Sequence, residues 1–177
     1  MKWCFVGFML VATAAADDDI KPPWERIRTG LDFYQAHSLP EWMWERFEAS
    51  ELKDEYIFSP HINPFYLRGD FDGDSTPDIA ILAKQRKSDK VGIIVFFAEG
   101  AIYVIAGVKR VGDGNDDLRS VDAWHVHSRL EIQREAIYFG KPEPAYVAEG
   151  LVIEKLMAAS VLLYWDGSIF QWKQRAD

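Results

Sequence analysis

The spacing of the apolar residues changes from helical to strand-like near residue 56. Upstream, residues 24–36 and 41–52 carry hydrophobic side chains at helical intervals, which predicts two short amphipathic helices. Their apolar stripes consist of Trp24, Ile27, Leu31 and Tyr34 in the first segment and of Trp44, Phe47 and Leu52 in the second. We expect both stripes to pack into a core, which is the commoner use of such a surface; the alternative is a recognition surface.

Downstream of residue 56 the chain consists of strand-like runs joined by short turns. The runs span residues 65–68, 79–84, 91–98, 101–108, 121–127, 146–153, 160–165 and 169–173. Glu99-Gly100 links two of them, and Asp166-Gly167 has the residue types of a type I′ hairpin turn. Connections this short join antiparallel strands, because parallel strands need long crossovers. The predicted fold class is therefore α+β: two short N-terminal helices packed on a mainly antiparallel β-sheet with hairpins.

Residues 1–16 have the pattern of a cleaved secretory signal peptide. Lys2 precedes an apolar run over residues 3–13, and three alanines at 14–16 supply the small side chains that signal peptidase requires. The run is shorter than the roughly 20 residues that span a bilayer, which disfavours a membrane anchor. We expect residues 17–23 to form a flexible lead-in and residues 24–177 to form a single α+β domain in a secreted or periplasmic protein.

The cysteine count and the net charge limit the kinds of partner and of reaction that suit this chain. Cys4, the single cysteine, lies within the predicted signal, so the mature chain would have neither disulfides nor thiolate chemistry. Without Lys2, 19 basic residues stand against 28 acidic ones, a net charge of −9. Nucleic acid is a poor partner for such a chain, because phosphate binding needs a basic surface. No later apolar run is long enough to predict membrane insertion after signal cleavage.

The segment GDFDGDSTPD, residues 69–78, concentrates acidic side chains in one loop. Asp70, Asp72, Asp74 and Asp78 occupy loop positions 1, 3, 5 and 9, and the main-chain carbonyl of Thr76 at position 7 can point to the same side. So many carboxylates repel one another unless they are hydrated or share a counter-ion. Carboxylate and carbonyl oxygens with one or two waters are the ligands that calcium prefers. The spacing therefore predicts a calcium site at residues 70–78.

The same spacing opens an EF-hand loop, but the rest of the loop differs. An EF-hand needs glycine at position 6 and glutamate at position 12, whereas this chain has Ser75 and Ile81 there and strands on both sides. The segment YLRGDFDGDSTPDIAIL instead resembles the strand-loop-strand calcium element of FG-GAP and VCBS-type repeats. The resemblance covers the loop and not a whole propeller. It implies a structural calcium ion held by the four aspartates and the main chain of Thr76.

Two alternatives to calcium stay open at the loop. The aspartates can form a hydrated turn whose charges are balanced by nearby basic residues. The basic residues available for this are Arg68, Lys84, Arg86 and Lys87. The other alternative is a different divalent ion. The C-terminal segment SVLLYWDGSIFQWKQ resembles small exported bacterial proteins of unknown role that carry such a loop, a resemblance that implies no activity.

Two weaker metal-binding patterns occur further along the chain. His125 and His127 are two residues apart in a predicted strand, a spacing that can hold zinc if a third ligand is nearby. Asp113, Asn115 and Asp117 repeat the 1-3-5 spacing without an acid at the ninth position. A solvent-facing or packed histidine pair and a hydrated loop are the simpler interpretations.

These patterns predict a non-catalytic, secreted or periplasmic calcium-binding protein of the binding or structural type, with an unidentified protein partner as one possibility. One alternative is a periplasmic inhibitor or immunity-type protein whose acidic surface binds a basic enzyme. Another is a small exported hydrolase that uses paired carboxylates. The glutamates available for such a pair are Glu131, Glu135, Glu149 and Glu154. The motifs of serine nucleophile elbows and phosphate-binding glycine loops are missing from the sequence.

Overall fold

The computed structural model describes residues 38–106, 116–138 and 148–176. The predicted signal (1–16), the lead-in (17–23) and the first predicted helix (24–36) lie outside these residues. The compact unit Glu41–Asp177 contains all the elements discussed below. Of the helices in the described ranges, none has the length and apolar character needed to cross a membrane.

The second predicted helix is present but shorter and divided, as α2 (Glu41–Ala49) and α3 (Leu52–Glu55). The strands that follow are β1 (Tyr56–Phe58), β2 (Tyr66–Gly69), β3 (Asp78–Gln85), β4 (Val91–Phe96), β5 (Ile102–Ile105), β6 (Ala123–His127), β7 (Gly150–Lys155), β8 (Ala159–Trp165) and β9 (Phe170–Ala176). The short 3-10 helix η2 (Leu118–Ser120) precedes β6, and α4 (Arg129–Tyr138) follows it. The α+β class and the antiparallel pairing are thus confirmed.

The strands form two antiparallel sheets, where the sequence pattern predicted one. The first has the order β1-β3-β4-β5, with β2 also paired to β3, and the second has the order β6-β7-β8-β9. The hairpins at Glu99-Gly100 and Asp166-Gly167 are confirmed. The second is not a type I′ turn, however, because residues 166–169 all lie between Trp165 and its partner Phe170.

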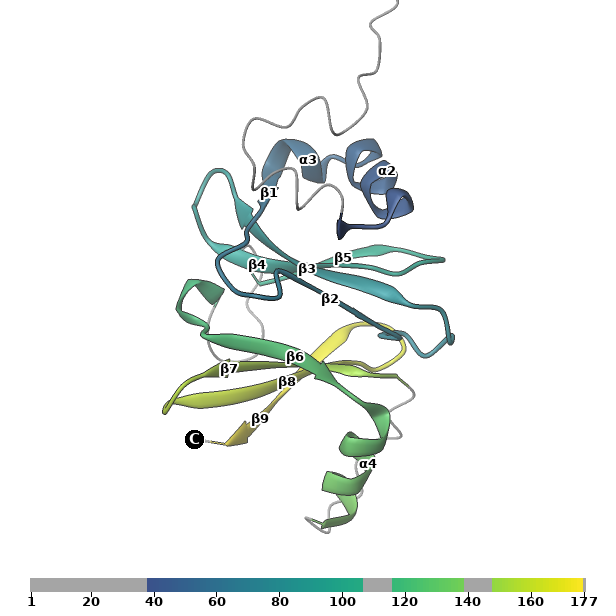
Figure 1. The fold of residues 1–177 in the computed structure, drawn as a ribbon, viewed down its shortest axis with the longest axis vertical. Helices are drawn as coiled ribbons and strands as arrows, with labels where there is room; N and C mark the ends of the chain where they lie inside the picture. Colours follow the sequence, from purple (N-terminus) through teal and green to yellow (C-terminus); the bar gives the residue numbers. More distant parts are fainter. Residues whose placement is uncertain (1–37, 107–115, 139–147, 177) are drawn as a thin grey trace, which may run out of the picture. The chain divides into compact units, whose positions relative to one another are not determined.

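The two sheets face each other (Figure 1), and buried side chains from both form one hydrophobic core between them. Side chains alternate along β3, so Ala80 and Leu82 enter this core while Ile79 and Ile81 point to the opposite face. All four are buried, which means that both faces of the central strand are covered. This explains the continuous apolar run that β3 shows in the sequence.

Helices cover the outer faces of the two sheets. On the first sheet, Phe47 of α2 packs against Phe58 and Phe96, with ring centroids 4.5 and 6.5 Å apart. On the second sheet, Ile132 of α4 packs with Val152 and Leu162.

Helix α4 was not predicted, although its first turn carries a sequence signal. The Ser128 Oγ atom accepts a hydrogen bond from Glu131 N at 3.3 Å, and a Glu131 carboxylate oxygen accepts one from Ser128 N at 3.0 Å. This reciprocal pair is the capping box that the S-x-x-E pattern encodes.

Candidate metal centre

The acidic loop closes a hairpin between β2 and β3. Gly69 at the end of β2 is the register partner of Asp78 at the start of β3. The chain between these two residues must therefore return to its starting point, which brings Asp70 next to Asp78. This antiparallel pairing, more than the loop sequence itself, places the first and the last acid of the pattern together.

Three of the four aspartates converge. Asp70, Asp72 and Asp78 each offer a carboxylate oxygen within 4.8 Å of the others. Asp78 is completely buried, and Asp70 and Asp72 are half-buried. Three hard oxygen ligands at this separation could hold a metal ion. Asp74 is exposed and does not belong to this group.

The loop is shaped by hydrogen bonds from its own main chain to Asp70. Its Oδ1 accepts from Gly73 N at 2.8 Å, and its Oδ2 accepts from Ser75 N at 3.2 Å. Gly73 and Ser75 have φ angles of 86° and 73°, in the left-handed region. The chain thus takes at Ser75 a left-handed conformation that glycine adopts readily and that side chains disfavour.

The aspartates at positions 3 and 5 make similar local bonds. Asp72 Oδ1 accepts from Asp74 N at 3.1 Å, and Asp74 Oδ1 accepts from Thr76 N at 2.6 Å. Each bond has the form of an Asx-turn. The predicted ligand roles of Asp74 and of the Thr76 carbonyl are not tested by this arrangement and stay predictions.

Asp78 is the most perturbed acid of the loop. Burial raises its pKa to about 6; hydrogen bonds from Ala98 N and Phe71 N, both 2.8 Å long, oppose the rise, and the charges of Asp72 and Asp74 add to it. Burial likewise raises the pKa of Asp72. A nearby cation would reverse this trend, because positive charge favours the ionised carboxylate.

Glu149 also contacts the loop, which the sequence pattern did not predict. Its Oε2 accepts a hydrogen bond from Asp70 N at 3.0 Å, and its own N–H donates to the Asp70 carbonyl at 2.8 Å. A Cβ atom at Gly69 would lie 2.8 Å from the same Oε2, so glycine permits the close approach. Glu149 immediately precedes β7, and it therefore connects the loop of the first sheet to the second sheet.

The lysine and arginine side chains that the structure describes form no ion pairs with the acidic loop. Lys84 pairs with Asp89 at 3.0 Å, and Arg86 donates to the Lys53 carbonyl. Within the described ranges, no lysine or arginine forms an ion pair with any of the four loop aspartates. The alternative in which basic residues neutralise the turn therefore lacks the expected contacts.

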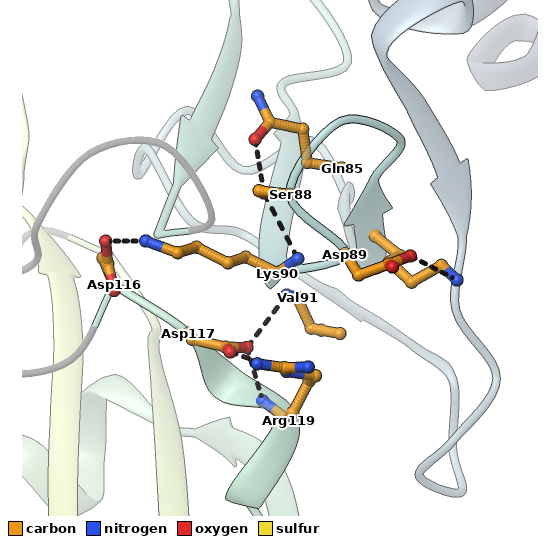
Figure 2. Close-up of polar contacts among 9 residues, drawn as sticks. Gln85, Ser88, Asp89, Lys90, Val91, Asp116, Asp117 and Arg119 are labelled. Carbon is orange, nitrogen blue, oxygen red and sulfur yellow. Dashed lines mark hydrogen bonds and ion pairs between the residues drawn. The ribbon is translucent and has the colours of Figure 1, made fainter.

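The second acidic pattern is used differently (Figure 2). Asp117 caps η2: its Oδ1 accepts from Arg119 N and from Val91 N, each at 3.1 Å. Burial alone would raise the Asp117 pKa, but these bonds and the Arg119 guanidinium bring it below its ordinary value. Lys90 pairs with the neighbouring Asp116. Asp113 and Asn115 lie outside the described residues, so the predicted second calcium site is not tested.

The histidine pair belongs to no cluster of metal-binding side chains within the described part of the chain. His127 is buried and His125 is exposed, with ring centroids 6.3 Å apart. His127 Nδ1 lies 3.8 Å from a carboxylate oxygen of Glu131, the residue that caps α4. Glu131 and Glu149, both candidates for paired catalytic carboxylates, thus make structural contacts in separate places.

No family model matches the chain, and neither the curated proteins nor the solved structures include a significant match to it. The likeness to FG-GAP and VCBS-type loops accordingly rests on the sequence of residues 66–82 alone. What is established is a mainly β structure in which Asp70, Asp72 and Asp78 form an acidic cluster that could hold a metal ion.

Proposed function

We propose that residues 70–78 bind one calcium ion, and that the protein is an exported, non-catalytic calcium-binding protein whose ion has a structural role. The observation that carries this proposal is the convergence of Asp70, Asp72 and Asp78 within 4.8 Å. The lack of ion pairs between the loop aspartates and basic residues, within the described ranges, supports it. The Asp74 carboxylate and the Thr76 carbonyl would complete the ligand set with water.

The chemistry of the loop favours calcium over magnesium. Calcium accepts six to eight oxygen ligands in flexible arrangements, whereas magnesium requires a near-ideal octahedron of shorter bonds. An irregular loop with one buried and two half-buried carboxylates suits the more permissive ion. We expect affinity in the weak extracellular class, with a dissociation constant of about 10⁻⁴ to 10⁻³ M, which suits an exported protein.

A bound ion would stabilise more than the loop. Its charge would relieve the repulsion among the carboxylates and fix Asp70, whose main chain bonds to Glu149 next to the second sheet. At ten times its dissociation constant, the ion would add about 1.4 kcal/mol to the free energy of unfolding. For a chain of this size, that corresponds to a rise of about 4 °C in the thermal midpoint.

The test is thermal unfolding in calcium, in magnesium and in chelator. We expect a calcium-specific rise of the midpoint in the wild type, no rise in Asp72→Asn, and a normal rise in the control Asp54→Asn, which removes an exposed charge from α3. Equal midpoints of the wild type in chelator and in millimolar calcium would reject the proposal. Asp74→Asn then tests whether the exposed fifth position of the loop is a ligand.

A further inference from the structure

A second candidate site lies between the two sheets, and its chemistry is independent of the acidic loop. It is an apolar cavity of about 160 Å³. Its lining includes Ile105 and Ala106 at the end of β5, Leu118 of η2, Ile153 and Lys155 of β7, and Ala159 and Val161 of β8. An apolar space that joins two sheets and opens to the surface is a common place for a small ligand.

Among the described residues, the cavity lies where two strands of the facing sheets, β5 and β8, differ in length. Tyr103 of β5 packs on Trp165 and Phe170, with ring centroids 4.7 and 5.9 Å away. Two residues later β5 ends at Ile105, and Ala106 leaves the strand with a φ angle of 61°. Strand β8, by contrast, extends back to Ala159. In the described part of the chain, the first part of β8 therefore has no β5 residue opposite it.

One wall of the cavity is held in place by polar contacts outside it (Figure 2). Asp117 caps η2 and accepts a hydrogen bond from Val91 N, and Lys90 pairs with Asp116. These bonds hold Leu118 in its buried position against the core. This wall of the cavity therefore does not have to be ordered by a ligand.

A positive charge stands at the rim. Side chains alternate along β7, so Lys155 lies on the same face as Leu151 and Ile153, which belong to the core between the sheets. Its ammonium group donates one hydrogen bond to the Ser120 carbonyl at 2.8 Å. An ammonium has three protons, so two remain to meet an anionic group. Lys155 thus places a positive charge at the rim of an apolar cavity, which favours a ligand with one apolar and one anionic end.

The turn after Lys155 presents further apolar surface. Leu156 is 72% exposed and Met157 is fully exposed. Lys155 and Ala159 on either side of this turn both line the cavity. The turn between these two lining residues thus carries exposed apolar side chains, although neither Leu156 nor Met157 lines the cavity itself.

We propose that this cavity binds a small amphiphilic anion, namely a carboxylate with one hydrocarbon chain or ring, with the apolar part between the sheets and the carboxylate at Lys155. An apolar cavity of about 150 Å³ accommodates benzene, so the enclosed part corresponds to about six carbons. The charge of Lys155 selects the anion, and the apolar walls select the chain. This function is separate from calcium binding and does not depend on it.

The test is a titration of the mature protein with butanoate, hexanoate and the neutral analogue 1-hexanol. Binding is measured from the chemical shifts of the protein's methyl groups in NMR spectra. We expect saturable shifts centred on Leu118, Ile153 and Val161, with affinity increasing about 4-fold for each added methylene. Lys155→Met should weaken hexanoate about 3-fold and leave hexanol unchanged. The matched control for this charge is Lys87→Met, on an exposed turn.

A second pair of variants tests the location. Ala159→Phe places a ring in the cavity and should weaken hexanoate and hexanol at least about 10-fold, because the ring occupies their space. Ala158→Phe adds the same ring one residue earlier, at an exposed position that does not line the cavity, and should bind normally. Absence of saturable shifts in the wild type, or equal binding by both phenylalanine variants, would overturn the proposal. If Lys155→Met binds hexanoate as tightly as the wild type does, Lys155 does not bind the carboxylate and this part of the proposal is overturned.

Discussion

The hydrogen bonds between Glu149 and Asp70 provide a direct test of how the acidic loop is attached to the second sheet. Replacing Glu149 by alanine removes the carboxylate oxygen that accepts from Asp70 N at 3.0 Å. It leaves the main-chain bond from Glu149 N to the Asp70 carbonyl in place. Glu149→Gln keeps an oxygen that can accept the same N–H but removes the charge.

The expected loss follows from these contacts. A hydrogen bond to a charged group contributes about 1.5–3 kcal/mol when buried, and partial exposure of Glu149 reduces this to about 1–2 kcal/mol. We therefore expect Glu149→Ala to lower the free energy of unfolding by about 1–2 kcal/mol, and Glu149→Gln by at most about 0.5 kcal/mol. If the bond also positions Asp70 for calcium, Glu149→Ala should bind the ion several-fold more weakly.

Urea unfolding followed by tryptophan fluorescence, in chelator and in calcium, measures both effects. Glu45→Ala on the exposed side of α2 controls for the loss of a negative charge. If Glu149→Ala is as stable as the wild type, the hydrogen bond from Asp70 N to Glu149 does not stabilise the fold. If Glu149→Ala and Glu149→Gln lower the free energy of unfolding equally, loss of the hydrogen-bond acceptor does not cause the destabilisation.

Substitutions at three further positions test other parts of the structure. Asp78→Ala should be less stable than Asp78→Asn by about 1–3 kcal/mol in urea unfolding, because the amide oxygen can still accept one of the two N–H groups that Asp78 serves; equal stabilities would contradict this. Asp117 keeps a lowered pKa despite burial, so its stabilising contribution is present above about pH 4 and is lost as the pH falls further. The thermal midpoint of the wild type should therefore approach that of Asp117→Asn on acidification, and a constant difference would argue against the cap. Gly92→Ala would place a Cβ atom 2.5 Å from the Ala106 carbonyl oxygen and should lower the free energy of unfolding by about 1–3 kcal/mol by thermal denaturation, whereas wild-type stability would show that the backbone can move apart.

Local sequence chemistry was sufficient to predict the acidic loop. The 1-3-5-9 spacing of its aspartates, between two strand-like runs, identified the segment that the structure shows as a β2–β3 connection. Asp74 lies outside the cluster of Asp70, Asp72 and Asp78, and its role as a ligand stays a prediction. The prediction was incomplete where the contacts are not local. Glu149 reaches the loop from 79 residues away, and no spacing rule connects residues at that separation.

The sequence by itself determined that the chain alternates short helices, apolar strands and tight turns, because side-chain periodicity and turn residues act over a few positions. It did not determine that the strands divide into two facing sheets. Strand partners are chosen by packing across the whole core, and an apolar run such as β4 suits either sheet equally well. The cavity near Lys155 depends on the same choice. Among the described residues, the cavity lies where β5 ends before β8 does, and this arrangement arises only when the two sheets pack together.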